Sequence, residues 1–293
     1  MIWVYTVTES NELHARYASS LKELQNLNKE ADWLWIDFMD PSDKEFEVIA
    51  GLLEKTEIVS DIKGQKIFSR PERVNDCILF SLPHTVFKDA LNTFPIYVII
   101  KNKTLLTVRN GYSSKAMKNA LKTFEDCVGK ICEGSVNSSF ILNRLFHEIS
   151  NENLDVVMAL RERIDKIEEQ ALANPADKKI SRSVFATKRE LSALERILWS
   201  QRELMLSVSE GMVPMIETSE EIRATLSHPI NNISREISLL DSHNNALDSI
   251  LSLQDLGMIH RVERNLIYLT IMALIVSVLL ILLEIDIISL LSS

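Results

Sequence analysis

The first 110 residues alternate short apolar runs with polar stretches. Runs rich in β-branched and aromatic residues, each bounded by polar residues, lie at 2–5, 33–37, 77–82, 96–100 and 105–108. This pattern is typical of short strands. The last two runs flank the polar stretch 101–104, which predicts a hairpin with a short loop.

A helix is predicted between two of these strands. Ser42 is a candidate N-cap, and Glu45 stands three residues later, the spacing of a capping box. Apolar residues then recur at helical spacing, at Phe46, Ile49 and Leu52-Leu53. Strands mixed with helices predict an α/β domain over residues 1–137.

The pattern changes to long amphipathic helices near residue 138. Apolar positions at helical spacing continue from 140 to 172 and from 178 to 210. Asn174-Pro175 interrupts the first run, and 211–214 ends the second. We therefore expect paired long helices over residues 138–213.

A third helix is expected to begin near Pro229, because proline is favoured in the first helical turn. No residue forces a stop before Leu283, so this helix would be about 80 Å long. One such rod cannot bury both of its sides alone, which predicts an oligomeric stalk over 214–265 and a membrane segment over 266–291.

The membrane segment carries no charge from Leu266 to Leu283. At about 1.5 Å per residue these residues approach the roughly 30 Å of a hydrocarbon core. A buried core helix is the alternative, but such a helix is seldom apolar on every face. Arg261 and Arg264 precede the segment, and Glu284 follows it. Positively charged residues that flank a membrane span are usually on its cytosolic side. We therefore expect a cell-membrane protein with a cytosolic N-terminal part and a single C-terminal span.

Polar residues recur every seven positions along this helix. The stripe comprises Glu263, Thr270, Ser277 and Glu284, with Leu266, Ala273 and Leu280 at the intermediate steps. A polar stripe is costly against lipid, so it should face protein or water. In a ring of subunits it would form polar rings separated by apolar ones, which suits a cation path. Plain helix packing is the alternative explanation.

Acidic residues repeat with the same period on the stalk, at Asp241, Asp248 and Asp255. In an oligomer their carboxylates would repel one another, and a divalent cation would relieve that repulsion. A solvated charged face is the alternative. Two stalk histidines, His243 and His260, match no zinc spacing and are expected at the surface.

Composition removes several classes of function. The chain has 293 residues, a net charge of −9 and no basic cluster, which argues against a nucleic-acid partner. Only 7 Gly and 7 Pro argue against a turn-rich all-β chain. The cysteines at 77, 127 and 132 match no zinc spacing. No phosphate-binding loop, nucleophile elbow or metalloprotease motif occurs, so the chain is not expected to be an enzyme.

Several motifs follow one another in a distinctive order. They are Trp35-Ile36-Asp37-Phe38 with Asp40-Pro41-Ser42 and Glu45; Asp61 ahead of Arg70-Pro71-Glu72; Leu106-Thr107-Val108-Arg109; Ile164-Asp165 with Ile167-Glu168; Lys188-Arg189-Glu190-Leu191; and Leu269-Thr270. This ordered set resembles the CorA family of divalent-cation channels over about the first 283 residues.

The resemblance implies a funnel-shaped homopentamer whose membrane helix lines a pore. It implies Mg²⁺ as the transported ion, with Co²⁺ and Ni²⁺ also passed. It further implies that Mg²⁺ bound between neighbouring cytosolic domains keeps the channel closed. Asp61 matches the family's acidic position in the first domain, and it would bridge through Mg²⁺ to a stalk carboxylate of the next subunit.

Two departures from the family leave other readings open. The family ends its pore helix with Gly-Met-Asn, but Ile287-Ile288-Ser289 stands at the expected place. The sequence then ends without a second span. A non-conducting or truncated metal-sensing regulatory subunit is therefore an alternative, as is a tail-anchored interaction scaffold. Zinc transporters of the ZntB type share the architecture, so the ion is also open.

Overall fold

The computed structural model describes residues 2–7, 13–17, 23–24, 26, 33–53, 56–111, 117–120, 122, 138–175, 177–216 and 218–291. The chain forms two compact units, each built from separate stretches of sequence. One combines Met1–Leu160 with Glu190–Asp241, and the other combines Arg161–Arg189 with Ser242–Ser293.

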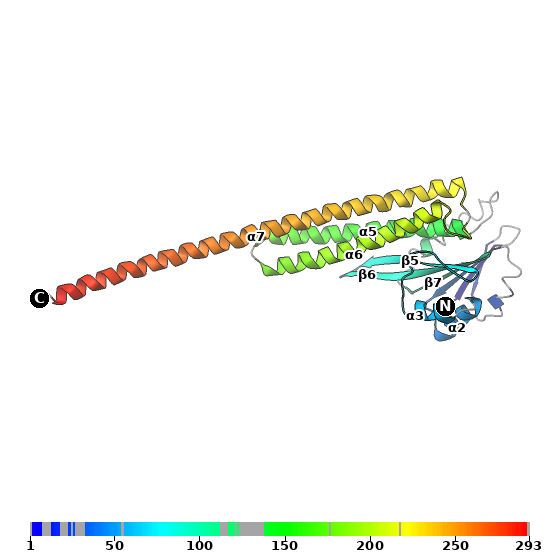
Figure 1. Ribbon diagram of the computed structural model, residues 1–293, viewed down its shortest axis with the longest axis horizontal. Helices are drawn as coiled ribbons and strands as arrows, with labels where there is room; N and C mark the ends of the chain where they lie inside the picture. Colours follow the sequence, from blue (N-terminus) through cyan, green and yellow to red (C-terminus); the bar gives the residue numbers. More distant parts are fainter. Residues whose placement is uncertain are drawn as a thin grey trace. The chain divides into compact units, whose positions relative to one another are not determined.

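The first unit is built on a mixed seven-stranded sheet (Figure 1). Its strands, in the order β2-β1-β3-β7-β6-β5-β4, are Leu13–Tyr17, Ile2–Val7, Trp33–Met39, Thr104–Arg109, Leu91–Lys101, Cys77–Phe87 and Glu72–Val74. Only the β3–β7 pair is parallel among the described strands. The mixed sheet confirms the expected α/β fold class.

The hairpin expected at 101–104 is present between β6 and β7. Lys101 and Thr104 pair across it, and Asn102 adopts a positive φ of 52°. Asparagine tolerates this left-handed conformation better than most residues, and a two-residue hairpin turn requires it. The short turn therefore sets the register of the two buried strands.

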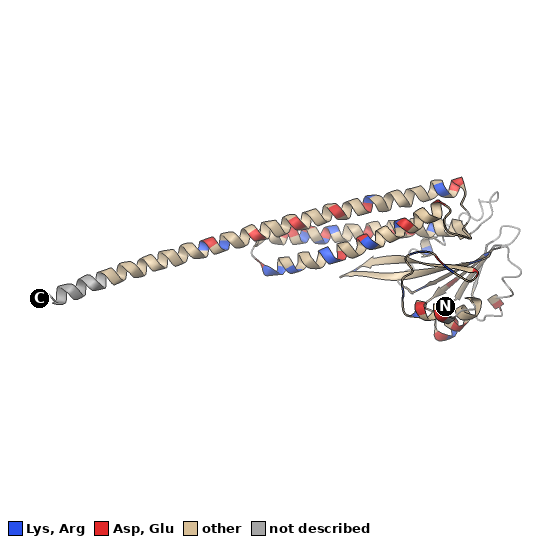
Figure 2. Ribbon diagram, viewed as in Figure 1, with Lys and Arg blue, Asp and Glu red and all other residues tan. Residues whose placement is uncertain are grey.

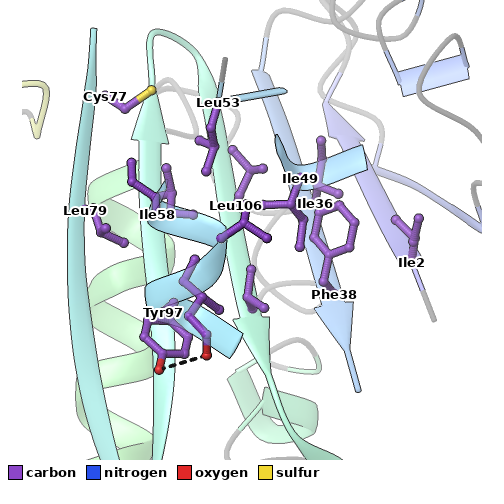
Figure 3. Packing of buried hydrophobic residues seen from close by; sticks show 14 of the residues in the cluster. Ile2, Ile36, Phe38, Ile49, Leu53, Ile58, Cys77, Leu79, Tyr97 and Leu106 are labelled. Carbon is purple, nitrogen blue, oxygen red and sulfur yellow. Dashed lines mark hydrogen bonds between the residues drawn. The ribbon is translucent and has the colours of Figure 1, made fainter. Parts of the chain in front are cut away.

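Two short helices cover one face of the sheet, and Figure 3 shows the core that they enclose. They are α2, Asp43–Leu53, and α3, Thr56–Lys63. Ile49 and Leu53 of α2 pack in one cluster with Phe38 and Leu106 of the sheet. Burying each such side chain contributes about 1.5–3 kcal/mol, so this cluster holds the helices to the strands.

The predicted capping interaction begins α2. The Glu45 carboxylate accepts hydrogen bonds from the Ser42 backbone N–H at 2.7 Å and from the Ser42 hydroxyl at 2.9 Å. In the usual box the serine hydroxyl would instead accept from the third helical N–H. The reciprocal carboxylate bond is present and confirms the prediction that a helix begins here.

The opposite face of the parallel pair holds a buried ion pair. Arg109 donates from Nε and from a terminal nitrogen to the Asp37 carboxylate, at 2.8–3.1 Å. Thr107 donates to the same carboxylate at 2.7 Å and accepts from the Trp35 indole at 3.0 Å. Removing one partner of such a pair typically costs about 3–5 kcal/mol, because a buried charge is left alone.

Three long helices follow: α5, Ser138–Ala173; α6, Lys178–Ser209; and α7, Glu220–Leu291. The expected start of the third helix at Pro229 was wrong, because Pro229 lies inside α7. Ser219 is the N-cap, since its hydroxyl accepts from the Ile222 N–H at 3.2 Å. Acidic residues in the first turn also favour this earlier start.

A buried polar network joins the sheet to α5 and α6 within the first unit. Thr85 donates to Asn153 at 3.1 Å, and Asn153 donates to Gln201 at 2.7 Å. Gln201 in turn donates to the backbone oxygen of Pro83 at 2.6 Å. Each buried amide is satisfied by its neighbour, so the network specifies how the helices register on β5.

In the second unit the α5–α6 loop packs against α7. A Cβ atom at Gly257 would lie 2.3 Å from Cβ of Pro175 and 3.2 Å from its backbone carbon. Buried Gln254 accepts from the Ser181 hydroxyl at 2.7 Å and donates to the Asp177 backbone oxygen at 2.8 Å. Glycine at 257 thus permits a close approach that the Gln254 bonds hold in place.

Two ionisable side chains of α7 are buried, contrary to the surface position expected for His243. Burial lowers the pKa of His243, helped by the Arg161 charge, while Asp165 acts in the opposite direction. Burial also raises the pKa of Glu236 to about 7, against a smaller opposite effect of Arg235. The Oε2 atom of Glu236 has no hydrogen-bond partner among the described residues.

The substitution Glu236→Gln should remove a pH-dependent loss of stability. The native carboxyl keeps its proton up to about pH 7, whereas the unfolded one releases it near pH 4.5, so wild-type stability falls between these values. At pH 8 the variant should gain on the order of 3 kcal/mol over the wild type, and at pH 4 nothing. Thermal unfolding of the full chain in detergent, followed by circular dichroism across this range, measures the difference.

Glu203→Gln is the matched control, because Glu203 is exposed on α6. It removes the same charge from a solvated position and should leave the pH profile of unfolding unchanged. Equal profiles for wild type and Glu236→Gln would show that the Glu236 carboxyl titrates normally in the folded protein.

Candidate ion path

The last part of α7 is apolar and exposed on all sides. Every residue from 258 to 281 is exposed, including Leu266 at 57% and Leu280 at 59%. Among the described residues, this is the one helix long and apolar enough to cross a membrane. Water strongly disfavours an apolar surface of this size, whereas lipid accommodates it. One C-terminal apolar helix was expected, and the structure has it.

The polar stripe lies along this exposed helix. The Thr270 hydroxyl donates to the Leu266 backbone oxygen at 2.8 Å, and Glu263 contacts the His260 ring nitrogen at 3.2 Å. Ala273 and Ser277 are exposed. The Thr270 bond satisfies the hydroxyl within its own helix, so it would also form if the stripe faced only a neighbouring helix. It does not distinguish a water-facing stripe from plain helix packing.

The geometry of an α-helix keeps the stripe on one side. Seven residues turn a helix by about 700°, so a heptad repeat drifts by only about 20° each time. From Glu263 to Glu284 the drift is about 60°, which a slight left-handed supercoil removes. Glu284 lies within α7, but its side chain is outside the described residues.

Asp61 lies in α3 and already has a cationic partner in its own chain. Lys66 donates to Asp61 at 2.8 Å, and this bond, followed by the charges of Asp61 and Glu72, raises the pKa of Lys66. Burial, together with the charge of Asp61, raises the pKa of the Tyr97 hydroxyl to about 12. Both Asp61 and Lys66 are about half exposed, so the pair is open to solvent ions.

The stalk acids are not equivalent. Lys188 donates to Asp248 at 2.6 Å within the second unit. Asp241 and Asp255 are exposed on α7 and have no ion-pair partner among the described residues. No group of three metal-ligating side chains comes together in the described part of a single chain.

Comparison with known proteins decides the family. Residues 30–279 match the CorA-like Mg²⁺ transporter protein family. The chain belongs to this family. The sequence resemblance is therefore confirmed over most of the chain, while no curated protein matches the sequence.

Several solved structures share the fold. The complete CorA magnesium transporter of Methanocaldococcus jannaschii is 18% identical, with a TM-score of 0.72, over 91% of this chain and 80% of that chain. Full-length CmaX is 14% identical, with a TM-score of 0.70, over 92% and 81% of the two chains. The ZntB cytoplasmic domain of Vibrio parahaemolyticus is 12% identical, with a TM-score of 0.61, over 89% and 98%.

The CorA-like fold also brings together residues that the sequence did not mark. His84 of β5 contacts Glu152 of α5 beside a cavity of about 290 Å³, which Asp155 also lines. His84 Nδ1 and Glu152 Oε1 are buried without hydrogen-bond partners in the described part of the chain. These residues are 68 positions apart, so no local spacing could reveal the pair.

Cysteine labelling can locate the water-facing side of the membrane helix. In a background free of native cysteines, Thr270→Cys and Ser277→Cys should react with a membrane-impermeant thiol reagent. Met272→Cys and Leu279→Cys lie about 200° round the helix from them and should stay unmodified. Mass spectrometry of the reconstituted protein gives the modified fraction of each variant.

Thr270→Cys and Met272→Cys lie at similar depths on opposite faces of the helix, and so do Ser277→Cys and Leu279→Cys. Each variant is therefore the control for the other variant at its depth. Uniform reactivity at all four positions, or reaction of Met272→Cys and Leu279→Cys alone, would contradict a water-facing polar stripe.

Proposed function

We propose that this CorA-family chain is one subunit of a pentameric channel that carries divalent cations, Mg²⁺ first, across the cell membrane. The observation that carries the proposal is the exposed apolar end of α7 with one heptad stripe of polar side chains. The sheet domain would lie on the cytosolic side, since Arg261 and Arg264 precede the span. The proposed pore-lining residues are Glu263, Leu266, Thr270, Ala273, Ser277, Leu280 and Glu284.

The chemistry of the stripe suits a hydrated ion. Mg²⁺ gives up its water slowly and keeps an octahedral oxygen shell. Hydroxyl groups at Thr270 and Ser277 would accept from the water of that shell without stripping it. Apolar rings at Leu266 and Leu280 would gate by excluding water, and Glu284 would concentrate the cation at the far end.

We further propose that Mg²⁺ regulates the channel through its cytosolic carboxylates. Asp61 of one subunit would bridge through the ion to a stalk carboxylate of the next, at Asp241, Asp248 or Asp255, and so hold the closed form. The contacts that Lys66 and Lys188 make support a competitive version of this idea. A divalent ion would have to displace these ammonium groups, so binding would need a high Mg²⁺ concentration.

One observation favours a second candidate. Ile287-Ile288-Ser289 stands where other family members have Gly-Met-Asn, and two of these side chains cannot supply an oxygen ligand. A subunit of this kind could sense Mg²⁺ without conducting it, or assemble with complete channels. If the chain forms the proposed channel, Co²⁺ and Ni²⁺ would be transported in addition to Mg²⁺.

Transport is tested by Mg²⁺ entry into proteoliposomes that contain only this protein. An internal Mg²⁺ dye should report entry above that of empty vesicles under an inside-negative potential. Glu284→Gln should abolish most of that entry, because it removes the charge at the end of the stripe. Asp286→Asn removes a neighbouring charge about 200° round the helix and should keep wild-type entry.

Absence of entry from folded, pentameric protein would overturn the channel and favour the regulatory subunit. Loss of entry in Asp286→Asn but not in Glu284→Gln would place the path on another face.

The regulatory site is tested by protection of the full chain from proteinase K. Millimolar Mg²⁺ should slow cleavage of the wild type, since a ligand that binds only the native state stabilises it. Asp61→Asn combined with Asp248→Asn should remove that protection. Lys66→Gln and Lys188→Gln should shift half-protection to lower Mg²⁺ concentrations, because each removes a competing ammonium group.

Asp43→Asn is the matched control, since Asp43 is also an exposed carboxylate with a lysine partner, Lys63, at 2.6 Å. It should leave Mg²⁺ protection unchanged. Protection that survives in Asp61→Asn with Asp248→Asn would remove these two residues from the site.

A further inference from the structure

Three cations at the start of α6, next to the α5–α6 loop, form no ion pair with the residues that the structure describes. They are Lys178, Lys179 and Arg182, and all three are exposed. The nearby Asp177 carboxylate is used locally, because it accepts from the Lys179 backbone N–H at 2.9 Å. In Figure 2 the ribbon is coloured blue, for Lys and Arg, at the start of α6.

The loop is held against α7 just ahead of the apolar segment. The close approach of Pro175 to Gly257 and the two hydrogen bonds of Gln254 fix its position within the second unit. The lysines therefore project from a defined level of α7 rather than from a free loop.

Further cations lie on α7 itself, between this level and the apolar segment. Arg261 and Arg264 are exposed and unpaired among the described residues. The acids at this level are Asp255 and Glu263, and Glu263 already contacts His260. These five cations outnumber the three acids Asp177, Asp255 and Glu263, so the charge that they make together is positive, in a chain whose net charge is −9.

The distances fit a membrane surface. From Gly257 to Leu266 an α-helix rises about 14 Å. The headgroup layer takes up roughly 5–8 Å of that height. The height that remains above the headgroup layer is smaller than the length of a lysine side chain added to a Debye length of about 8 Å. The lysine ammonium groups would therefore interact with the charge of the headgroups. Arg261 and Arg264 would lie within the headgroup layer itself.

We propose that Lys178, Lys179, Arg182, Arg261 and Arg264 form a docking surface for anionic phospholipid headgroups. The α5–α6 loop, which is held against α7, would rest on the membrane surface. Anionic headgroups would then contact the protein up to the level of Gly257. This role is separate from conduction, so it would hold for a channel and for a regulatory subunit alike.

The test measures lipid binding to the full chain in detergent. Native mass spectrometry gives the apparent dissociation constant of phosphatidylglycerol and of phosphatidylcholine. Lys178→Gln combined with Lys179→Gln should weaken phosphatidylglycerol binding by about fivefold for each lysine, and phosphatidylcholine binding should not change. The difference should shrink as salt is raised.

Arg189→Gln combined with Arg196→Gln is the matched control. Both arginines are exposed further along α6 and form no described ion pair, so the change in charge is equal. This control should bind phosphatidylglycerol as the wild type does. Equal weakening in both double variants would show a general charge effect and overturn the proposal, as would equal affinity for the two lipids. Competition by millimolar inorganic phosphate would assign the site to free phosphate instead.

Discussion

The exposed apolar surface at the end of α7 constrains how the whole chain can be arranged, because water strongly disfavours such a surface. The segment from 258 to 281 is exposed on every face and is largely apolar. In the same helix, residues before 250 alternate buried and exposed positions as an amphipathic helix does. One continuous helix therefore passes from a part packed against protein to a part that is long and apolar enough to cross a membrane.

The sequence predicted β1, β3, β5, β6, β7 and α2 of the sheet domain. It missed β2, β4 and α3, and it did not predict the interaction that joins the two central strands. Asp37 and Arg109 were recognised as members of two separate motifs, and the structure shows that these motifs meet in the parallel β3–β7 pair. A charge within an apolar run is a local signal that something must compensate it. Finding its partner 72 positions away requires the strand order, which periodicity does not contain. The motif is therefore explained by a buried ion pair that neither half could reveal alone.

The candidate sites divide in the same way. Heptad spacing places the polar residues of α7 on one side of the helix, because helical geometry is local, and their pore-lining role stays a prediction. It could not predict that Asp248 contacts Lys188, which lies 60 positions away on another helix. Nor could it predict that His243 is buried, since burial there depends on the packing of the second unit. The start of α7 was misplaced for a simpler reason: the capping by Ser219 outweighs the positional preference of Pro229.

The lysine partners change how the cytosolic carboxylates should be understood. A row of free acids would bind divalent cations at low concentration, because mutual repulsion would be relieved at once. Here two of the proposed ligands, Asp61 and Asp248, are each neutralised by an ammonium group in the described structure. Both pairs are partly exposed, so each contributes little to stability and exchanges readily. Under the proposed regulation, such pairs would yield to a divalent ion only when it is abundant, so the site would respond to high rather than low Mg²⁺ concentration.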